Sequence, residues 1–461
     1  MLTSRPVVRL IAVPAVALGA LGWALPGVPA PTASAEVTGP DCSQVAADQD
    51  SEPASGVGDA WTAMRLDAVD RLLDDRGRAR GAGVTVAVLD SGLSEQAFPD
   101  ARRVTDVVDP FRDDRGIDPH GTTVAGLLAG PPVEVDGDGD DGDEGAAPRP
   151  VGIAPDVRLV DVPVYESRGT TSDSLPPTAD NLAGGLEVVD RTGGVDVVLV
   201  PFAVARADDD ASRRVVRAVR RLTRDGVVVV AASGDRPTEE AERTFDRFGG
   251  YVPGEDAGGA LLPASLGPEE PLVVTVSSTV VDGPVAGSPV LLSSDTEVAA
   301  PTQDATSYAL NGETCRVAGP STELAAAEVA GVLALLLSVY PDPAEAVSRL
   351  LETATGTQLP QNRPAPALRD RAQGSGVVQP YAALTRVLAF TGARPDDDSG
   401  VAAEVDHARQ PEPREAAAPV PQEAPDVLGS TRGAAVWWGL LGGGALALAL
   451  VARPVLARRR R

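Results

Sequence analysis

The sequence predicts an α/β fold in which a parallel β-sheet carries helices on both faces. The main observation is a set of short apolar runs rich in β-branched residues, which are typical of strands buried on both sides. Segments with helical periodicity alternate with these runs, as expected for parallel strands joined by crossover helices. A helix predicted at 324–340 is apolar on all sides and should therefore be buried.

The predicted elements follow one another in a regular order. The strand at 84–90 is bounded by glycines and ends in the carboxylate Asp90. Further strands are predicted at 104–108, 157–164, 196–200, 227–232, 272–277 and 297–300, and helices at 120–129, 182–191, 212–225 and 324–340. Sites in such sheets are built at the carboxyl ends of strands, so Asp90 marks the edge where a site is expected. A buried carboxylate also needs a partner, because leaving it unpaired is unfavourable.

The composition excludes some classes of function. The chain of 461 residues has a formal net charge of −26 and contains no lysine. Because its arginines are dispersed among many aspartates, no nucleic-acid-binding face is expected. Only two histidines occur, His120 and His407, so a histidine-based site is easy to locate. The cysteines Cys42 and Cys315 permit one disulfide, and two unpaired thiols are the alternative.

The N-terminal region has the features of a signal peptide spanning residues 1–35. Arginines precede an apolar stretch, and Ala33-Ser-Ala35 forms an A-x-A cleavage site. Residues 36–80 are predicted to form an extension that turns amphipathic at 61–73 and packs on the main domain of residues 81–392.

The C-terminal region predicts a membrane anchor. Residues 434–452 carry no charge and have about the length that spans the hydrocarbon core of a bilayer. The arginine-rich tail at 453–461 is expected in the cytoplasm, which places the main domain outside it. Residues 393–433, which include His407, are rich in proline, alanine and acidic residues and predict a linker without a core. The sequence thus predicts a single-pass protein of the cell membrane.

The segment 131–150 is dominated by aspartate and glycine. Its spacing imitates the start of a calcium-binding loop but lacks the required glycine and the closing glutamate. A solvated loop is the favoured interpretation.

Four motifs resemble those of subtilisin-like serine proteases. In chain order they are Asp90-Ser-Gly92, His120-Gly-Thr122, Ala232-Ser-Gly-Asp235 and the segment before the alanine-rich helix. Gly374-Ser-Gly-Val-Val378 also resembles the family's C-terminal closing segment. The resemblance covers residues 81–388 and implies a subtilisin-like (peptidase S8-type) domain. With its signal peptide, extension, linker and single anchor, the architecture resembles mycosins, the membrane-anchored subtilisin relatives of type VII secretion systems. That resemblance implies a type VII secretion membrane complex as the partner.

The resemblance implies only part of the family's catalytic triad. In the family an aspartate orients a histidine, which activates a serine, and Asp90 and His120 match the first two positions. Counting back from Val329-Ala-Gly331 places Glu323 at the nucleophile position and Ser321 where the family has glycine. A register shift of two residues would make Ser321 the nucleophile, but it would break the match of the following helix.

Two further departures weaken the catalytic prediction. Asp235 stands where the family has the asparagine that donates a hydrogen bond to the oxyanion, and an ionised carboxylate cannot donate. The segment that matches the family's substrate-pairing strand contains Pro201, which has no N–H to offer a bound peptide.

The altered site is expected to form a charged cluster. We expect an ion pair between Glu323 and His120, with Asp90 on the other ring nitrogen and the negative charge of Asp235 nearby. Acidic neighbours should favour the imidazolium form of His120. One histidine with Asp90, Asp235 and Glu323 could also suggest a metal site. Because no second histidine is available and the family's site binds no metal, neither a metal nor a cofactor is expected.

Three functions are compatible with these residues. The favoured one is a mycosin-like pseudoprotease with a structural or assembly role in a type VII secretion system. The alternative is an active serine endopeptidase that uses Ser321. A third hypothesis is a peptide-binding module that uses the inactive cleft.

Overall fold

The computed structural model describes residues 37–104, 107–108, 117–133, 148–166, 177–235, 256–279, 290–317, 319–356 and 370–388. The predicted signal peptide, linker, membrane helix and basic tail lie outside the described residues, and so does the greater part of the acidic segment 131–150. The predicted fold class is therefore compared only with the described part of the chain.

A nine-stranded sheet forms the centre of the described part, in the order β12-β13-β9-β8-β6-β4-β1-β3-β2. Its strands are β1 (Thr85–Asp90), β2 (Arg102–Arg103), β3 (Arg158–Pro163), β4 (Val197–Val200), β6 (Val228–Ala232), β8 (Val273–Thr279), β9 (Val298–Pro301), β12 (Thr355–Gly356) and β13 (Gly376–Val377). Neighbouring strands run parallel except for the β12–β13 pair. The predicted parallel sheet is confirmed. The strand predicted at 104–108 is wrong, because β2 ends at Arg103 and residues 107–108 are not in a strand.

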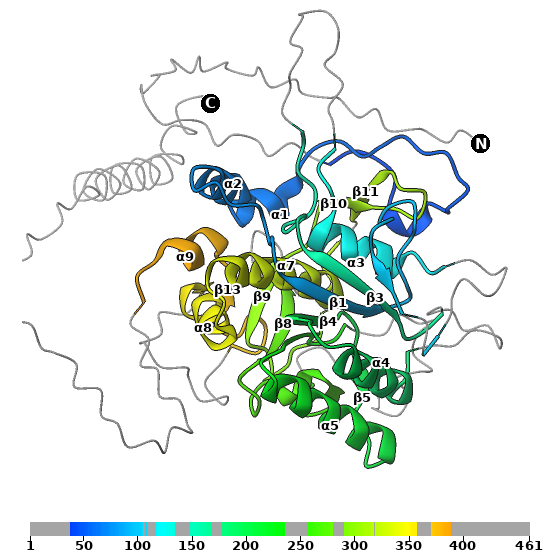
Figure 1. Ribbon diagram of the computed structural model, residues 1–461, viewed down its shortest axis with the longest axis vertical. Coiled ribbons are helices and arrows are strands. Elements are labelled where there is room, and N and C mark those ends of the chain that lie inside the picture. The colour runs from blue at the N-terminus through cyan, green and yellow to red at the C-terminus, as the bar shows by residue number, and fades with distance from the viewer. Residues whose placement is uncertain are drawn as a thin grey trace, which may run out of the picture. The chain divides into compact units, whose positions relative to one another are not determined.

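Helices cover both faces of this sheet, as predicted (Figure 1). On one face lie α3 (His120–Ala129) and α7 (Thr322–Val339), and on the other α4 (Ala179–Thr192) and α5 (Asp210–Arg224). Alternate residues of β1 serve the two faces: Val86 and Val88 join the cluster around α7, whereas Ala87 and Leu89 join the cluster around α4 and α5. This two-sided burial explains why the strands are uninterrupted apolar runs.

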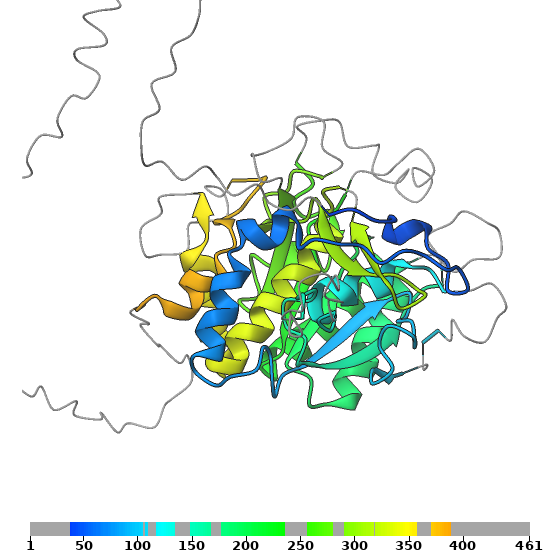
Figure 2. The same cartoon turned by 90° about the horizontal axis from the view of Figure 1, so that it is seen from above.

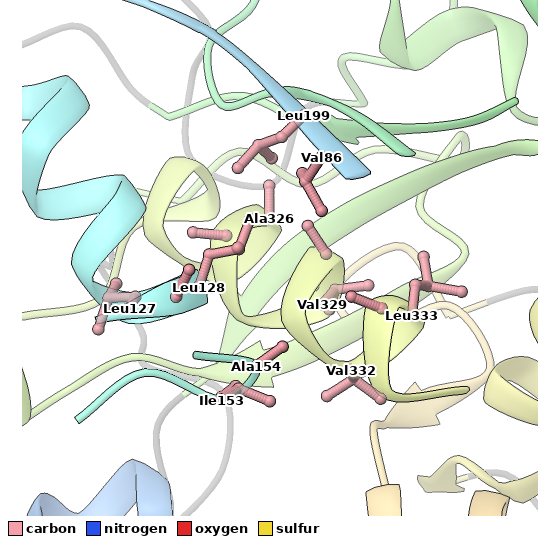
Figure 3. Close-up of a cluster of buried hydrophobic side chains, with 14 of the residues drawn as sticks. Val86, Leu127, Leu128, Ile153, Ala154, Leu199, Ala326, Val329, Val332 and Leu333 are labelled. Carbon is pink, nitrogen blue, oxygen red and sulfur yellow. The ribbon is translucent and has the colours of Figure 1, made fainter. Parts of the chain in front are cut away.

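The helix α7 is the core of the larger cluster. Its side chains pack between those of α3 and those of β1 and β4, as shown for Ala326, Leu128, Val86 and Leu199 (Figure 3). Within the described residues it is also the one helix long and apolar enough to cross a membrane, but 78% of its apolar window is buried inside the domain. Its hydrophobicity is therefore that of a core helix.

The N-terminal extension packs on the domain, with η1 at Cys42–Gln44, α1 at Gly58–Ala63 and α2 at Leu66–Asp74. The amphipathic segment is split into two helices because Arg65 adopts a left-handed conformation with φ 54°. α2 lies beside α9 (Pro380–Thr385), which Figure 2 shows from above.

The remaining elements are α8 (Pro343–Thr353), η3 (Ala264–Leu266) and two small antiparallel ladders, β5 (Val204–Ala205) with β7 (Leu261–Leu262) and β10 (Ala305–Tyr308) with β11 (Thr314–Val317). A disulfide joins Cys42 to Cys315 and so ties the extension to β11, the strand that directly precedes α7 in the chain. The predicted disulfide is confirmed.

Candidate functional site

Asp90 and His120 meet at the carboxyl edge of the sheet. Asp90 is the last residue of β1 and is 1% exposed, and His120 is the first residue of α3. The Nδ1 atom of His120 lies 2.8 Å from Asp90 Oδ2 and 3.1 Å from Oδ1. The glycine after His120 is needed at this junction, because a Cβ on Gly121 would lie 2.5 Å from the carbonyl oxygen of Gly92. The sequence His-Gly-Thr therefore permits the close approach of α3 to the end of β1.

The second nitrogen of His120 faces a carboxylate. Glu323, the second residue of α7, places its Oε2 atom 3.2 Å from His120 Nε2. The imidazole thus lies between Asp90 and Glu323, and all three side chains are at least four-fifths buried. The structure brings together these three of the residues that the sequence placed in one site.

Ser321 has a different role in this geometry. It is the N-cap residue of α7, and its Oγ accepts a hydrogen bond from the N–H of Glu323 at 3.2 Å. The same hydroxyl donates to Asp235 Oδ2 at 2.7 Å. N-cap serines satisfy one of the unpaired N–H groups at a helix start, so these contacts account for Ser321 without catalysis.

Asp235 follows β6 and holds the start of α7 in place. Its carboxylate accepts the hydroxyl of Ser321 and the N–H of Thr322, the latter at 3.0 and 3.1 Å. The Oγ1 atom of Thr322 in turn accepts the N–H of Gly234 at 3.1 Å. Burial raises the pKa of Asp235 to about 7, the negative charge of Glu323 adds to this, and the hydrogen bonds from Thr322 and Ser321 oppose it.

Replacing Asp235 with asparagine is expected to flatten the pH dependence of stability. Because the folded pKa of about 7 lies above the ordinary value of 3.8, the folded protein retains a proton that the unfolded chain has released. The contribution of Asp235 to stability is full below about pH 4 and is lost as the pH rises through about 7. Asparagine does not ionise. As the pH rises over this range, the free energy of unfolding of D235N should therefore fall by on the order of 2 kcal/mol less than that of wild type.

Urea denaturation at about pH 5 and about pH 8 measures this difference. Asp225→Asn is the matched control, since Asp225 is an exposed aspartate at the C-cap of α5. Equal pH slopes for D235N and wild type would contradict the assignment.

Tyr165 is a site residue that the sequence interpretation missed. It lies just beyond β3, its hydroxyl donates to Asp90 Oδ1 at 2.8 Å, and it lies 3.3 Å from His120 Nδ1. Phe202 packs against the ring of Tyr165 edge to face, with centroids 5.6 Å apart. The sequence signal that could have identified Tyr165 is its position just after a predicted strand, because residues at the carboxyl ends of adjacent parallel strands share one edge of the sheet.

No metal site emerges from the described ranges, where no three histidine, cysteine, aspartate or glutamate side chains are placed to hold an ion. In particular, Asp90 and Glu323 lie on opposite nitrogens of the one described histidine.

The sequence model of the Subtilase family (Peptidase_S8) matches residues 81–376. The chain belongs to the subtilase family. The relatives of this subtilase include Mycosin-1 of Mycobacterium tuberculosis, 29% identical over 382 residues that cover 76% of this chain and 79% of the relative. Mycosin-1 of Mycolicibacterium smegmatis is 27% identical over 351 residues, covering 68% and 71% respectively. The predicted resemblance to the mycosin branch is confirmed.

Solved structures agree on the fold. The crystal structure of MycP1 with the N-terminal propeptide removed superposes with a TM-score of 0.51 at 25% identity, covering 73% of this subtilase and all of that chain. A chain in the structure of an intact ESX-5 inner membrane complex gives a TM-score of 0.51 at 19% identity, with 92% and 94% coverage.

Proposed function

We propose that this subtilase is a membrane-anchored, mycosin-like pseudoprotease with a structural or assembly role in a type VII secretion system. One observation carries the loss of proteolysis: the ring nitrogen that would activate a serine lies 3.2 Å from Glu323 Oε2. In acyl transfer by this fold, the histidine takes a proton from the nucleophile. An ionised Glu323 has no proton to give, and its attack on a peptide carbonyl would form an anhydride.

The environment of the oxyanion position supports the same proposal. Catalysis of acyl transfer needs a donor aimed at the developing negative charge. Asp235 occupies that position by its motif, and its oxygens already accept hydrogen bonds from Ser321 and Thr322. Above a pH of about 7 it is also ionised. A tetrahedral intermediate would then meet repulsion instead of stabilisation.

The mycosin relatives support the secretion role. Both curated relatives named above are mycosins, and one structure of the same fold is described as MycP1 from the ESX-1 type VII secretion system. Another belongs to an ESX-5 inner membrane complex. We carry this association to the present chain as part of the proposal, together with a single-pass anchor at 434–452 and a cytoplasmic tail.

The proteolytic alternative requires Ser321 to act as the nucleophile. Its Oγ would have to leave Asp235 and the N–H of Glu323, and Glu323 would have to move away from His120. Use of the cleft to bind a peptide without cleavage needs neither change and is compatible with the proposed function.

A fluorophosphonate probe tests the loss of proteolysis. Wild-type protein is expected to stay unlabelled, because the probe reacts with activated serines. Glu323→Ser restores a hydroxyl beside His120 and should give slow labelling, and E323S combined with D235N should label faster since the oxyanion position regains a donor. Labelling of wild type that disappears in Ser321→Ala would overturn the pseudoprotease assignment.

Co-purification tests the secretion role separately. The tagged full-length chain, solubilised from its own membranes, should migrate with the secretion membrane complex on a native gel. Migration only as a free protein would contradict an assembly role, whatever the labelling result.

A further inference from the structure

A cavity of about 670 Å³ opens at the end of the sheet opposite His120. Its lining includes Thr85 and Arg158, which are the first residues of β1 and β3. Asp90 terminates the same strand β1, and five residues of a strand span roughly 17 Å. The cavity is therefore separate from the charged cluster and is independent of the proposed function.

The walls of this cavity are apolar. Phe98, Leu159 and Val160 line it and are 7%, 9% and 4% exposed, so they present fixed hydrocarbon surface. The volume lies in the range of about 300 to 1,000 Å³ that is typical of ligand pockets. On one rim, Gly193 and Gly194 have positive φ, and no atom lies within 4 Å of where a Cβ on either would be. That rim is open, so a bound chain could continue out of the cavity past it.

Two exposed arginines, Arg102 and Arg158, also line the cavity. Arg158 is held by hydrogen bonds from Nε and Nη2 to Thr85 Oγ1, at 3.1 and 2.9 Å, and from Nη2 to the carbonyl of Gly83 at 3.0 Å. Its Nη1 has no hydrogen-bond partner among the described residues, and the guanidinium of Arg102 has none there either. Asp100 also lines the cavity, which leaves one net positive charge in a chain of net charge −26.

This combination specifies the chemistry of a ligand. A guanidinium with its plane fixed by other hydrogen bonds is well suited to bind a carboxylate. A purely apolar ligand would leave the positive charge of Arg158 and Arg102 unused. A bare inorganic anion would leave the apolar walls unused. The open rim at Gly193 favours a ligand that is the end of a longer chain.

We propose that the cavity binds the free C-terminus of a peptide or protein whose last residue is apolar. The terminal carboxylate is held by Arg158 and Arg102, and the last side chain packs against Phe98 and Leu159. The polypeptide leaves the cavity past Gly193 and Gly194.

Fluorescence anisotropy with a labelled peptide tests this assignment. The probe is Gly-Ser-Gly-Ser-Ala-Val-Leu with fluorescein at its N-terminus, used with purified full-length protein in detergent. We expect saturable binding to wild type, and binding of the C-terminally amidated peptide should be weaker by about tenfold or more. Arg102→Glu should weaken binding of the free acid by a similar factor. Arg224→Glu should leave it unchanged, because Arg224 is an exposed arginine on α5 outside the cavity.

Three outcomes would overturn the proposal. Equal affinity for acid and amide would show that the carboxylate is not recognised, and R102E binding as tightly as wild type would show that the peptide binds elsewhere. Decanoate is the competitor that distinguishes a lipid-like acid: it should displace the peptide only at much higher concentration. Tighter binding of decanoate than of the peptide would assign the cavity to a fatty acid instead.

Discussion

Replacing His120 with alanine is expected to lower the free energy of unfolding by about 3 kcal/mol near neutral pH. The imidazole lies between Asp90 and Glu323, whose side chains are 1% and 17% exposed. Removing it leaves one deeply buried carboxylate and one largely buried carboxylate facing each other. The cost of an uncompensated buried charge exceeds that of losing the contact itself. Urea denaturation followed by far-UV circular dichroism measures the change.

A double-mutant cycle with Glu323→Gln identifies the cause of this effect. Glutamine keeps the shape of Glu323 and removes its charge, so H120A should be less destabilising in the E323Q background than in wild type. Arg224→Ala, an exposed arginine, should change stability by less than about 0.5 kcal/mol. If H120A lowers the free energy of unfolding as little as R224A does, the charged cluster does not hold this region of the fold together.

Replacing Glu328 with glutamine is expected to stabilise the domain at alkaline pH. Glu328 lies in the middle of α7, is 2% exposed, and has no hydrogen-bond partner for Oε2 among the described residues. Burial raises the pKa of this carboxyl well above its ordinary value of 4.5. The folded protein therefore holds a proton that the unfolded chain releases near pH 4. Stability is highest below that pH and is lost as the pH rises toward the folded pKa.

The advantage of E328Q should consequently grow with pH. Thermal denaturation at about pH 5 and about pH 8 is the measurement, and the two proteins should differ least at the lower value. Glu352→Gln is the control, since Glu352 is an exposed glutamate on α8. A benefit of E328Q that is the same at both pH values would mean that ionisation of Glu328 is not its cause.

The strands of the central sheet could be predicted from the sequence. Predicted ranges 84–90, 196–200 and 227–232 became β1 (Thr85–Asp90), β4 (Val197–Val200) and β6 (Val228–Ala232). Each is buried on both faces, and a strand of that kind requires a local run of apolar residues. The prediction at 104–108 failed because β2 is a two-residue edge strand, and pairing with β3 alone needs no apolar pattern.

The extension shows where local pattern is insufficient. An amphipathic stretch predicts a helix, but the left-handed backbone at Arg65 divides it into α1 and α2 so that both pack on the domain. The position of the break between α1 and α2 depends on the surface that the two helices contact, and that surface is formed by β9, β10 and α9, which are distant in the sequence.

By itself, the sequence determined the parallel sheet and the positions of Asp90 and His120 at its carboxyl edge, and its resemblance to subtilisin-like proteases is the basis of the proposal that Glu323 occupies the nucleophile position. These follow from periodicity and motif spacing, which are local properties of the chain. Only the tertiary structure decided that Tyr165 supports Asp90, that Glu328 is buried without a partner for Oε2 in the described residues, and that arginines line an apolar cavity. Each of these depends on which side chains meet across the fold, since burial and electrostatics arise from neighbours in space.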